Sequence, residues 1–303
     1  MGSLEPHGPP NLTLGTANSH SKWQADLSLT LAKTSRGTRL VEKSHTGPLY
    51  VQKPFYPEGG DIAHVYWLHP PGGIVSGDDL KIDVELKNQA QALLTTPGAG
   101  RVYKARADLS PQVQTVTLNI AQQSSLEWFP LETIVYPASN GVLKTVVSLP
   151  EDNSGRFIGW EITALGLPAS RFPFSSGQLL QQFQLWQNNR PLLLETLRIN
   201  AEDTRLTQGV CGLQGFTVSA FMLAGPFNAV DTENEQVLKV LQQLREATEQ
   251  IPGLGITHKH QFIIVRLLES SAEQARQKLT KIWQILRPEL LGVPATLPRI
   301  WAC

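Results

Sequence analysis

The chain has 303 residues, 41% of them hydrophobic and 17% charged, which is enough to bury a sizeable core in one large or two smaller domains. Lysine plus arginine equals aspartate plus glutamate, at 26 each, so no bulk charge attracts a polyanion and nucleic acid is disfavoured as a partner. Two cysteines cannot form a disulfide framework, and neither a secretory signal nor a run of about 18 apolar residues occurs, so we predict a cytoplasmic protein without a membrane span.

Residues 1–22 are rich in proline, glycine, asparagine and serine and have no hydrophobic period, which predicts a flexible tail. From Trp23 onward, apolar and polar residues alternate through Leu31, as in a half-buried strand. Similar short runs follow at residues 62–68, 80–86, 113–120, 142–149, 157–165, 179–186 and 192–199. Turn residues separate the runs, among them Pro97-Gly98 and Asn140-Gly141. The pattern predicts a mainly β body over residues 23–210, and leaves a sandwich, a barrel and a β-helical stack open.

The last part of the chain, residues 211–303, changes character. Apolar residues at helical spacing predict a helix over residues 231–250. A second helix is expected to begin at Ser270, because Ser270 and Glu273 form a capping box, and to end or kink at Pro288. Strands are expected at residues 215–223 and 260–268. We therefore predict a small α+β part with two helices, packed on the body.

Catalytic motifs are missing from the sequence. It contains no G-x-S-x-G, no H-E-x-x-H and no P-loop, which lowers the expectation of an enzyme. The alternative is a β-helical hydrolase or carbohydrate-binding protein. It requires an aromatic platform or a cleft with two carboxyl groups about 5 to 10 Å apart.

Two glycine-containing segments are the densest polar stretches. Residues 61–79 include three glycines that permit a tight turn or a nest of N–H groups for an anion, with Asp78 or Asp79 bonding its own backbone. Residues 94–104 place Arg101 and Lys104 near glycines but lack the order of a phosphate-binding loop. For both segments the structural turn is the favoured interpretation.

Histidines and cysteines give no lasting metal site. His64 and His69 are five residues apart, so on one strand they face opposite sides. His258 and His260 share a face if a strand begins there, although a surface stretch is favoured. Cys211 has no soft ligand near it in sequence and is expected in the core.

Several motifs occur in colinear order: P-F-Y-P-E at 54–58, L-H-P-P-G-G-I-V at 68–75, T-P-G-A at 96–99, L-E-W-F-P at 126–130, W-Q-I-L-R-P at 283–288 and L-P-R-I-W at 297–301. Together they resemble the UreD (UreH) family of urease accessory proteins, over nearly all of the chain from Trp23 onward. One position departs from the family pattern, since Arg171 stands where an acidic residue is expected.

The resemblance implies a β-helical fold with two helices near the end, and a scaffold that is not an enzyme. It also implies a complex with UreF, UreG and the urease apoprotein, through which nickel reaches urease, and an internal tunnel as the nickel route. No permanent cofactor is implied, only transient Ni²⁺. An obligate complex predicts poor solubility alone and rescue by co-expression with UreF.

An ion in transit needs weak oxygen or imidazole ligands at intervals. The candidates on or beside the inferred strands are Asp61, His69, Asp78, Glu132 and Glu161. Structural roles are expected for the motif residues Pro70, Pro71, Gly72, Gly73, Gly77, Pro97 and Gly98. Arg171 is left out because its charge is opposite to that of the family. A purely structural adaptor without ion traffic would have the same fold and partners, and the sequence does not separate the two.

Overall fold

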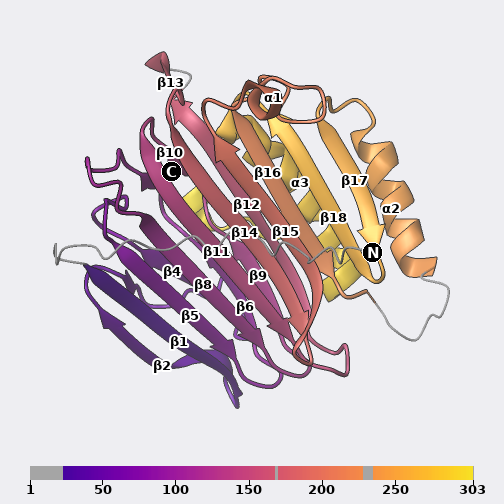
Figure 1. The fold of residues 1–303 in the computed structure, drawn as a ribbon. Helices are drawn as coiled ribbons and strands as arrows, with labels where there is room; N and C mark the ends of the chain where they lie inside the picture. The colour runs from indigo at the N-terminus through magenta and orange to yellow at the C-terminus, as the bar shows by residue number, and fades with distance from the viewer. Residues whose placement is uncertain (1–22, 168–169, 228–234, 303) are drawn as a thin grey trace, which may run out of the picture.

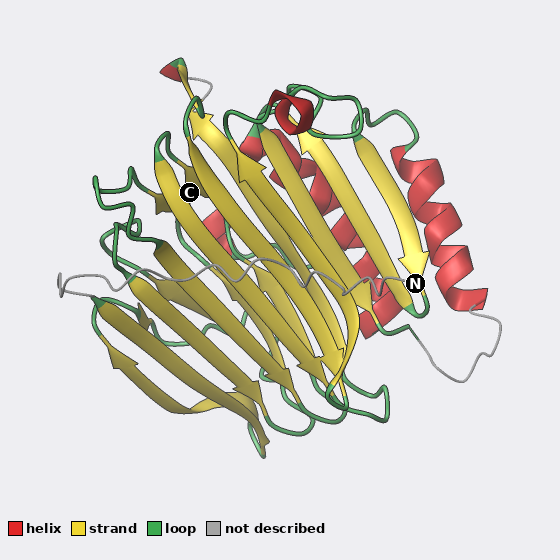
Figure 2. Cartoon of the chain, in the orientation of Figure 1, coloured by secondary structure: helices red, strands yellow, loops and turns green. Residues whose placement is uncertain are grey.

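A computed structural model describes residues 23–167, 170–227 and 235–302 (Figure 1). Two large β-sheets form most of the molecule, and helices flank one of them (Figure 2). The mainly β prediction is confirmed. The predicted N-terminal tail and Cys303 lie outside the described residues. Among the described residues, no helix combines the length and apolarity needed to cross a membrane.

The first sheet has the order β15-β14-β11-β8-β5-β1-β2. Its five inner strands are parallel to one another, and the edge strands β2 and β15 are antiparallel to their neighbours. The strands are β1 (Gln24–Thr34), β2 (Gly37–Thr46), β5 (Asp79–Leu86), β8 (Gln112–Ile120), β11 (Ser139–Leu149), β14 (Gly177–Gln187) and β15 (Arg190–Asn200).

The second sheet has the order β17-β18-β16-β12-β9-β6-β4-β3, with β7, β10 and β13 beside this path. Its strands β4, β6, β9 and β12 are parallel, and the strands from β16 onward are antiparallel. The strands are β3 (Tyr50–Val51), β4 (Ile62–Leu68), β6 (Gln91–Thr95), β7 (Gly100–Val102), β9 (Ser125–Phe129), β10 (Thr133–Val135), β12 (Arg156–Leu167), β13 (Phe172–Pro173), β16 (Val218–Gly225), β17 (Leu254–Lys259) and β18 (Phe262–Glu269).

From β4 to β14 the chain crosses from one sheet to the other after nearly every strand, which is the β-helical alternative. The parallel strands of the first sheet pair in register from one coil of the β-helix to the next. Side chains at equivalent inward positions therefore form columns that run across the sheet. One column, Leu29, Val84, Leu118, Val147 and Leu185, is wholly buried and apolar. Such columns supply the hydrophobic core between the sheets.

An inward column two inward positions nearer the starts of these strands breaks this apolar rule. It contains Ala25, Leu80, Gln114, Leu143 and Gln181, so two amide side chains stand in an otherwise apolar wall. Buried amides require hydrogen-bond partners or water. The two glutamines therefore mark a polar region between the sheets.

A helical layer covers the other face of the second sheet. Helices α2 (Glu235–Thr248) and α3 (Ala272–Leu291) pack their apolar faces on β12, β16 and β18 (Figure 1). Both faces of the central strands of this sheet are buried, so the sequences of β4, β6 and β9 are nearly continuous apolar runs. A short helix α1 (Thr204–Thr207) and a final 3₁₀ turn (Arg299–Ala302) complete the elements.

The predicted start of the second helix is wrong, and of the two alternatives at Pro288, an end or a kink, the end does not occur there. The N-cap is Ser271, whose hydroxyl accepts a hydrogen bond from the Gln274 N–H and whose backbone is extended, so the helix begins one residue later than the capping box indicated. The helix also continues through Pro288 to Leu291 and ends at Gly292, which has the left-handed conformation of a helix C-terminus.

Other local expectations are also corrected. Asn140 and Gly141 lie inside β11, where parallel pairing on both sides overrides their turn preference. Cys211 is exposed rather than in the core. His260 lies in the turn between β17 and β18 with φ 50°, so it does not share a strand face with His258.

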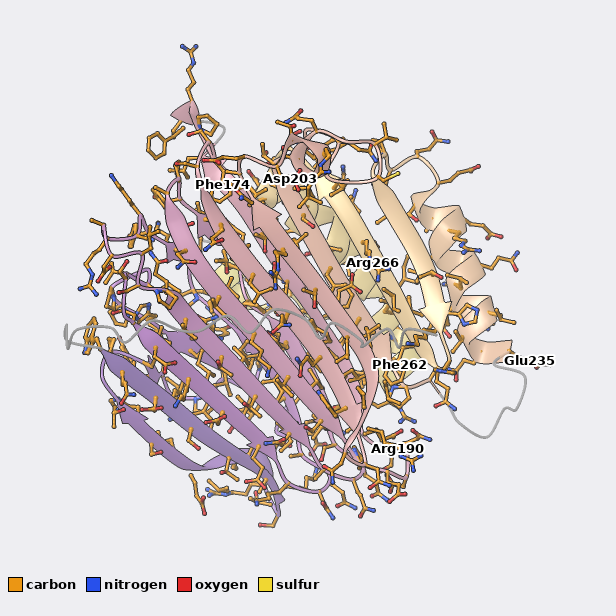
Figure 3. The ribbon with its side chains drawn as sticks, in the orientation of Figure 1. Phe174, Arg190, Asp203, Glu235, Phe262 and Arg266 are labelled. Carbon is orange, nitrogen blue, oxygen red and sulfur yellow. The ribbon has the colours of Figure 1, made fainter. Side chains whose placement is uncertain are left out.

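The two ends of the stack differ. At one end, short turns of four to six residues join the sheets, at residues 87–90, 121–124 and 150–155. At the other end, longer connections of nine to sixteen residues join them, at residues 69–78, 96–111, 130–138 and 168–176, and the last three include the short strands β7, β10 and β13. We call these the short-turn end, near Arg190, and the long-loop end, near Phe174 (Figure 3). Loops longer than a connection requires commonly carry function.

Candidate functional site: a polar cavity between the sheets

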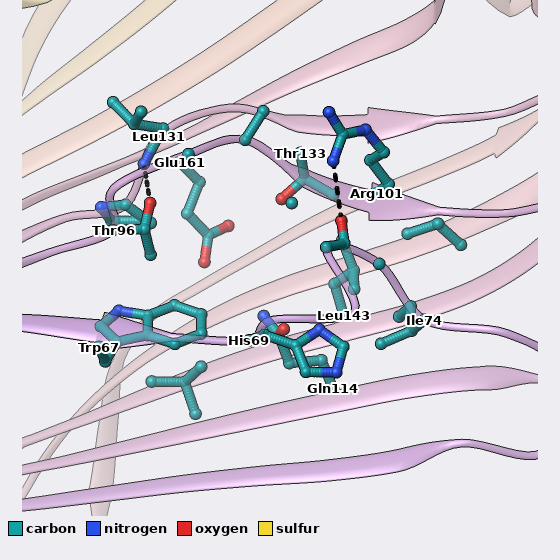
Figure 4. A pocket seen from close by; sticks show the side chains of 18 of the residues that line it. Trp67, His69, Ile74, Thr96, Arg101, Gln114, Leu131, Thr133, Leu143 and Glu161 are labelled. Carbon is teal, nitrogen blue, oxygen red and sulfur yellow. Dashed lines mark hydrogen bonds between the residues drawn. The ribbon is translucent and has the colours of Figure 1, made fainter. Parts of the chain in front are cut away.

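A cavity of about 260 Å³ lies between the two sheets at the long-loop end (Figure 4). Loop residues from three successive turns form its outer wall, and inward side chains of β11, β12 and β14 form its floor. The lining is largely apolar, with a few polar groups, as in many ligand sites. The polar residues of the lining include the two basic residues Arg101 and Lys144 as well as His69, Gln114, Thr145, Glu161 and Gln181.

Glu161 is the buried acid of this cavity. It stands on β12, and its Oε2 accepts a hydrogen bond of 2.7 Å from Nε2 of Gln181, whose Oε1 in turn accepts one of 2.7 Å from the Thr163 hydroxyl. The remaining accessible surface of Glu161 faces the cavity, although the residue lies deep in the protein (Figure 4). Desolvation raises the pKa of Glu161, and hydrogen bonds with Thr145 and Gln181 offset this only in part.

His69 also lines the cavity, as do the basic residues Arg101 and Lys144. It follows β4, and its Nε2 is buried without a hydrogen-bond partner among the described residues. Desolvation lowers the pKa of His69, while the nearby Asp78 carboxylate acts in the opposite direction. A neutral imidazole has a lone pair that can bind a divalent cation. The ring faces the same space as the Glu161 carboxylate (Figure 4).

The other three predicted contacts lie outside this cavity. Asp78 is buried, and its Oδ2 accepts a hydrogen bond of 2.9 Å from the Val75 N–H, so it bonds the backbone of its own loop. Asp61 is exposed and pairs with Lys33 at 2.5 Å. Glu132 lies between two lining residues but is not part of the lining itself. The structure thus brings together two of the five candidates, His69 and Glu161.

Most of the motif residues predicted to be structural form the loop wall of the cavity. Gly73 lies against the next loop, where a Cβ atom would come within 2.6 Å of Tyr103 Cε2. Gly72 and Gly77 have φ angles of 72° and 88°, which only glycine adopts freely. Pro70, Pro97 and Gly98 also line the cavity, while Pro71 is exposed beside it.

A second cavity, of about 310 Å³, adjoins the first where Glu161 and Gln181 line both. It extends toward the seam between β15 and β18, which Arg266 and Glu195 bridge. The Arg266 guanidinium Nε and Nη2 donate hydrogen bonds of 3.0 and 2.6 Å to the two carboxylate oxygens of Glu195. The two cavities together therefore extend from the long-loop end to this seam, and apolar side chains make up much of the lining of the second.

Sequence reasoning missed Gln114, Gln181, Glu195 and Arg266. The two glutamines did leave a signal, because each occupies an inward position in an alternating strand where an apolar residue is expected. The ion pair between Arg266 and Glu195 gave no signal in the sequence, because the two residues are 71 positions apart.

The cavity does not have the ligands of a permanent metal site. Within the described residues, no group of three or more histidine, cysteine, aspartate or glutamate side chains could hold an ion. His258 and His260 are not a chelating pair either, because Nδ1 of His258 lies 3.4 Å from the backbone oxygen of His260. One imidazole, one carboxylate and nearby amide oxygens suit brief contact with a hydrated cation.

A separate cluster of buried charges lies on the helical side of the second sheet. Arg287 of α3 is fully buried, and its donors bond both carboxylate oxygens of Glu58 and of Glu127, as well as the Pro294 carbonyl oxygen. Trp283 Nε1 also donates to Glu127, at 2.7 Å. Glu58, Glu127 and Arg287 come from three of the colinear motifs. These segments, distant in sequence, meet at one point in the fold.

Directions of the pKa shifts differ within this cluster. Desolvation raises the pKa of Glu127, which is buried between β9 and helix α3. Glu58 is also desolvated, but hydrogen bonds from His64 and Arg287 outweigh that effect and lower its pKa. His64 Nε2 lies 2.7 Å from Glu58 Oε1. The cluster therefore depends on Arg287 as the cation that both carboxylates share.

The buried state of Glu161 predicts a pH-dependent effect on stability. A folded-state pKa above the unfolded value adds stability at low pH, and this contribution is lost as the pH rises through the folded pKa. Glu161→Gln should therefore unfold at a higher urea concentration than the wild type at neutral pH, with a smaller difference below about pH 4.5. Urea titrations at both pH values measure this. Greater stability of the wild type at neutral pH would show that the carboxylate is well compensated.

Comparison with known proteins identifies the family. The sequence profile described as "UreD urease accessory protein" matches residues 24–302. The chain belongs to the UreD family of urease accessory proteins. "Urease accessory protein UreD" of Marinomonas sp. (strain MWYL1) is 43% identical over 284 residues, covering 93% of this chain and 90% of that protein. The UreD proteins of Hahella chejuensis and Saccharophagus degradans are 42% and 40% identical, covering 92% of this chain in each case and 90% and 93% of those proteins. The predicted family is confirmed.

Proposed function

We propose that this UreD family protein is a scaffold without catalytic activity that assists nickel insertion into urease, and that the ion passes through the cavity between the sheets. One observation carries the proposal: His69, whose Nε2 has no hydrogen-bond partner among the described residues, and the Glu161 carboxylate line the same cavity. Family membership supports the link to urease.

The chemistry of these two groups suits transit. A cation that enters a low-dielectric space must replace some of its water, and neutral imidazole, carboxylate and amide oxygens supply that replacement. Two strong donors are too few to retain the ion. Burial raises the pKa of Glu161, so the ionised form that binds a cation is disfavoured and binding is weakened further.

The family resemblance suggests the partners, and the low cysteine count together with the lack of a secretory signal in the sequence suggests the compartment. We propose a complex with UreF, UreG and the urease apoprotein in the cytoplasm, in which UreG hydrolyses GTP. Neither nucleic acid nor a membrane takes part in this proposal. Ni²⁺ is the cargo and not a resident cofactor.

Two other functions have less support from the structure. A β-helical hydrolase needs paired carboxylates, but Glu161 is the one carboxylate that lines the first cavity among the described residues, and Glu195 in the second is held by Arg266. An adaptor without ion traffic would leave the buried acid and the unpartnered imidazole unexplained.

Reconstituted urease activation tests the proposal. The assay combines urease apoprotein, UreF, UreG, Ni²⁺, GTP and either no added chain, the wild type or a variant. We expect no activation without the chain, and a roughly 10- to 100-fold loss for His69→Asn with Glu161→Gln, as for other metal-site changes. The control is Asp61→Asn with Glu132→Gln, which removes two carboxylates outside the cavity and should activate normally. Full activation by the first variant would favour the adaptor.

A further inference from the structure

We propose that Glu195 is a further contact for the divalent cation, at a mouth where the second cavity opens between β15 and β18, and that the Arg266 guanidinium occupies this contact when no ion is present. This inference rests on the proposed function, because it assigns the place where the ion passes between the cavities and the surface.

The second cavity reaches the protein surface at this seam. Gly253, Gly255 and Arg266 line it and are exposed, whereas Phe183 of the same lining is buried. The Arg266 side chain is 49% exposed and that of Glu195 is 29% exposed, so the pair lies between the cavity and the solvent. Breaking the pair would therefore open the cavity at this point.

The strand register places Glu161 and the ion pair on one line. Across the second sheet, Glu161 pairs with Phe221, and Phe221 pairs with Arg266. Paired residues on adjacent strands face the same side and are about 4.8 Å apart, so Arg266 is about 10 Å from Glu161. In the first sheet, Glu195 pairs with Phe183, whose ring centroid lies 5.0 Å from that of Phe221. Among the residues that line the second cavity, Glu195 is thus the carboxylate between Glu161 and the surface.

A charged pair is not needed to hold this seam together. The positions two residues before and after each member, on the same strand faces, are apolar: Leu193, Leu197, Ile264 and Leu268. Apolar side chains in place of an ion pair commonly stabilise a fold as well or better. A partly exposed pair contributes little to stability, so its charges separate at low cost.

The guanidinium shows that Glu195 accepts a cation. Both carboxylate oxygens bond Arg266, at 3.0 and 2.6 Å. A divalent ion has twice the charge of the guanidinium and is more compact, so it competes for the same oxygens. The long, half-exposed side chain of Arg266 can then turn into solvent. Arg266 therefore neutralises Glu195 in the free chain and is displaced by an ion that arrives from Glu161.

Titration of Ni²⁺ into the purified full chain, followed by calorimetry, tests the contact. Arg266→Met removes the charge and nearly keeps the length of the side chain, which frees Glu195. We expect it to bind Ni²⁺ about fivefold more tightly than the wild type, which corresponds to the roughly 1 kcal/mol that a partly exposed pair contributes at most. Adding Glu195→Gln should remove this gain. The control is Lys33→Met, which frees the Asp61 carboxylate outside both cavities and should bind Ni²⁺ as the wild type does.

Blocking the mouth tests the route separately. Apart from its chain neighbours, a Cβ atom at Gly255 would have one atom within 4 Å, the Arg266 carbonyl oxygen at 4.0 Å. Gly255 does not have a positive φ, so a side chain there does not strain the backbone. We expect urease matured with Gly255→Trp, or with the smaller Gly255→Leu, to hold background nickel. The control is Thr257→Trp, two residues along the same face of β17 and outside the lining, which should give fully loaded urease.

The two arms have separate contrary results. Unchanged nickel affinity of Arg266→Met, or a gain that persists with Glu195→Gln, would overturn the contact. Full nickel loading with both Gly255 variants, in complexes that assemble normally, or equal loss with Thr257→Trp, would overturn the mouth. Failure of the proposed function is distinguishable, because it would appear as normal activation by the variant that combines His69→Asn with Glu161→Gln.

Discussion

Arg287→Ala should destabilise the folded protein by about 3–5 kcal/mol, because it leaves buried carboxylates without their cation. Arg287 is wholly buried, and both Glu58 and Glu127 bond it within 3.0 Å. The two carboxylates would then repel one another in a region that water does not reach. Urea denaturation at neutral pH, with the midpoint and slope fitted together, measures the loss.

The matched control is Arg266→Ala. Arg266 also forms a two-point pair with a glutamate, but its side chain is 49% exposed, and pairs of this kind contribute about 1 kcal/mol or less. Similar losses for the two variants would mean that water enters the Arg287 cluster and compensates its charges. Glu127→Gln should cost less than Arg287→Ala, because it removes one of the two anions and leaves the cation paired with Glu58.

The strands of the first sheet were largely predictable from the sequence. Each of them from β5 to β15 has a predicted run within it, because one face of this sheet is polar and the alternation is clear. In the second sheet, β6 and β9 were missed, since both of their faces are buried and their sequences do not alternate. Periodicity could not separate a β-helical stack from a sandwich, because both place apolar residues inward at every second position.

The candidate site was predictable only in part. His69 and Glu161 were candidates because they lie on or beside inferred strands, near motifs that resemble those of the family. The cavity itself could not be inferred, because it depends on the register that sets Gln114 and Gln181 on one column with Leu143 between them. Asp61 and Glu132 have similar local sequence surroundings, and the tertiary fold alone places them outside.

The contact between Glu58, Glu127 and Arg287 could not be predicted from the sequence either. Glu58 and Arg287 are 229 residues apart, and Glu127 is 160 residues from Arg287. Nothing local in sequence distinguishes these charged residues from exposed ones. Their presence in the colinear motifs indicated importance, but not that they meet. A motif shared with a family can therefore mark a folding contact as readily as a site of function.

Filling the cavity should stop nickel delivery without removing any candidate ligand. Thr145 lies on β11, is buried and lines the cavity, so Thr145→Trp would place a large ring in the cavity. Overpacking of this kind costs typically about 1–3 kcal/mol, which a folded domain of this size tolerates. Thr145→Val is the matched control, because it removes the hydroxyl group and keeps the volume.

The direct measurement is the nickel content of urease after reconstitution with each of these chains, at equal yields of the assembled complex. The passage of nickel through the cavity predicts that urease matured with Thr145→Trp holds background nickel, while Thr145→Val and the wild type give fully loaded enzyme. Full loading with Thr145→Trp, in a complex that assembles normally, would contradict the account, since the ion would then reach urease by another route.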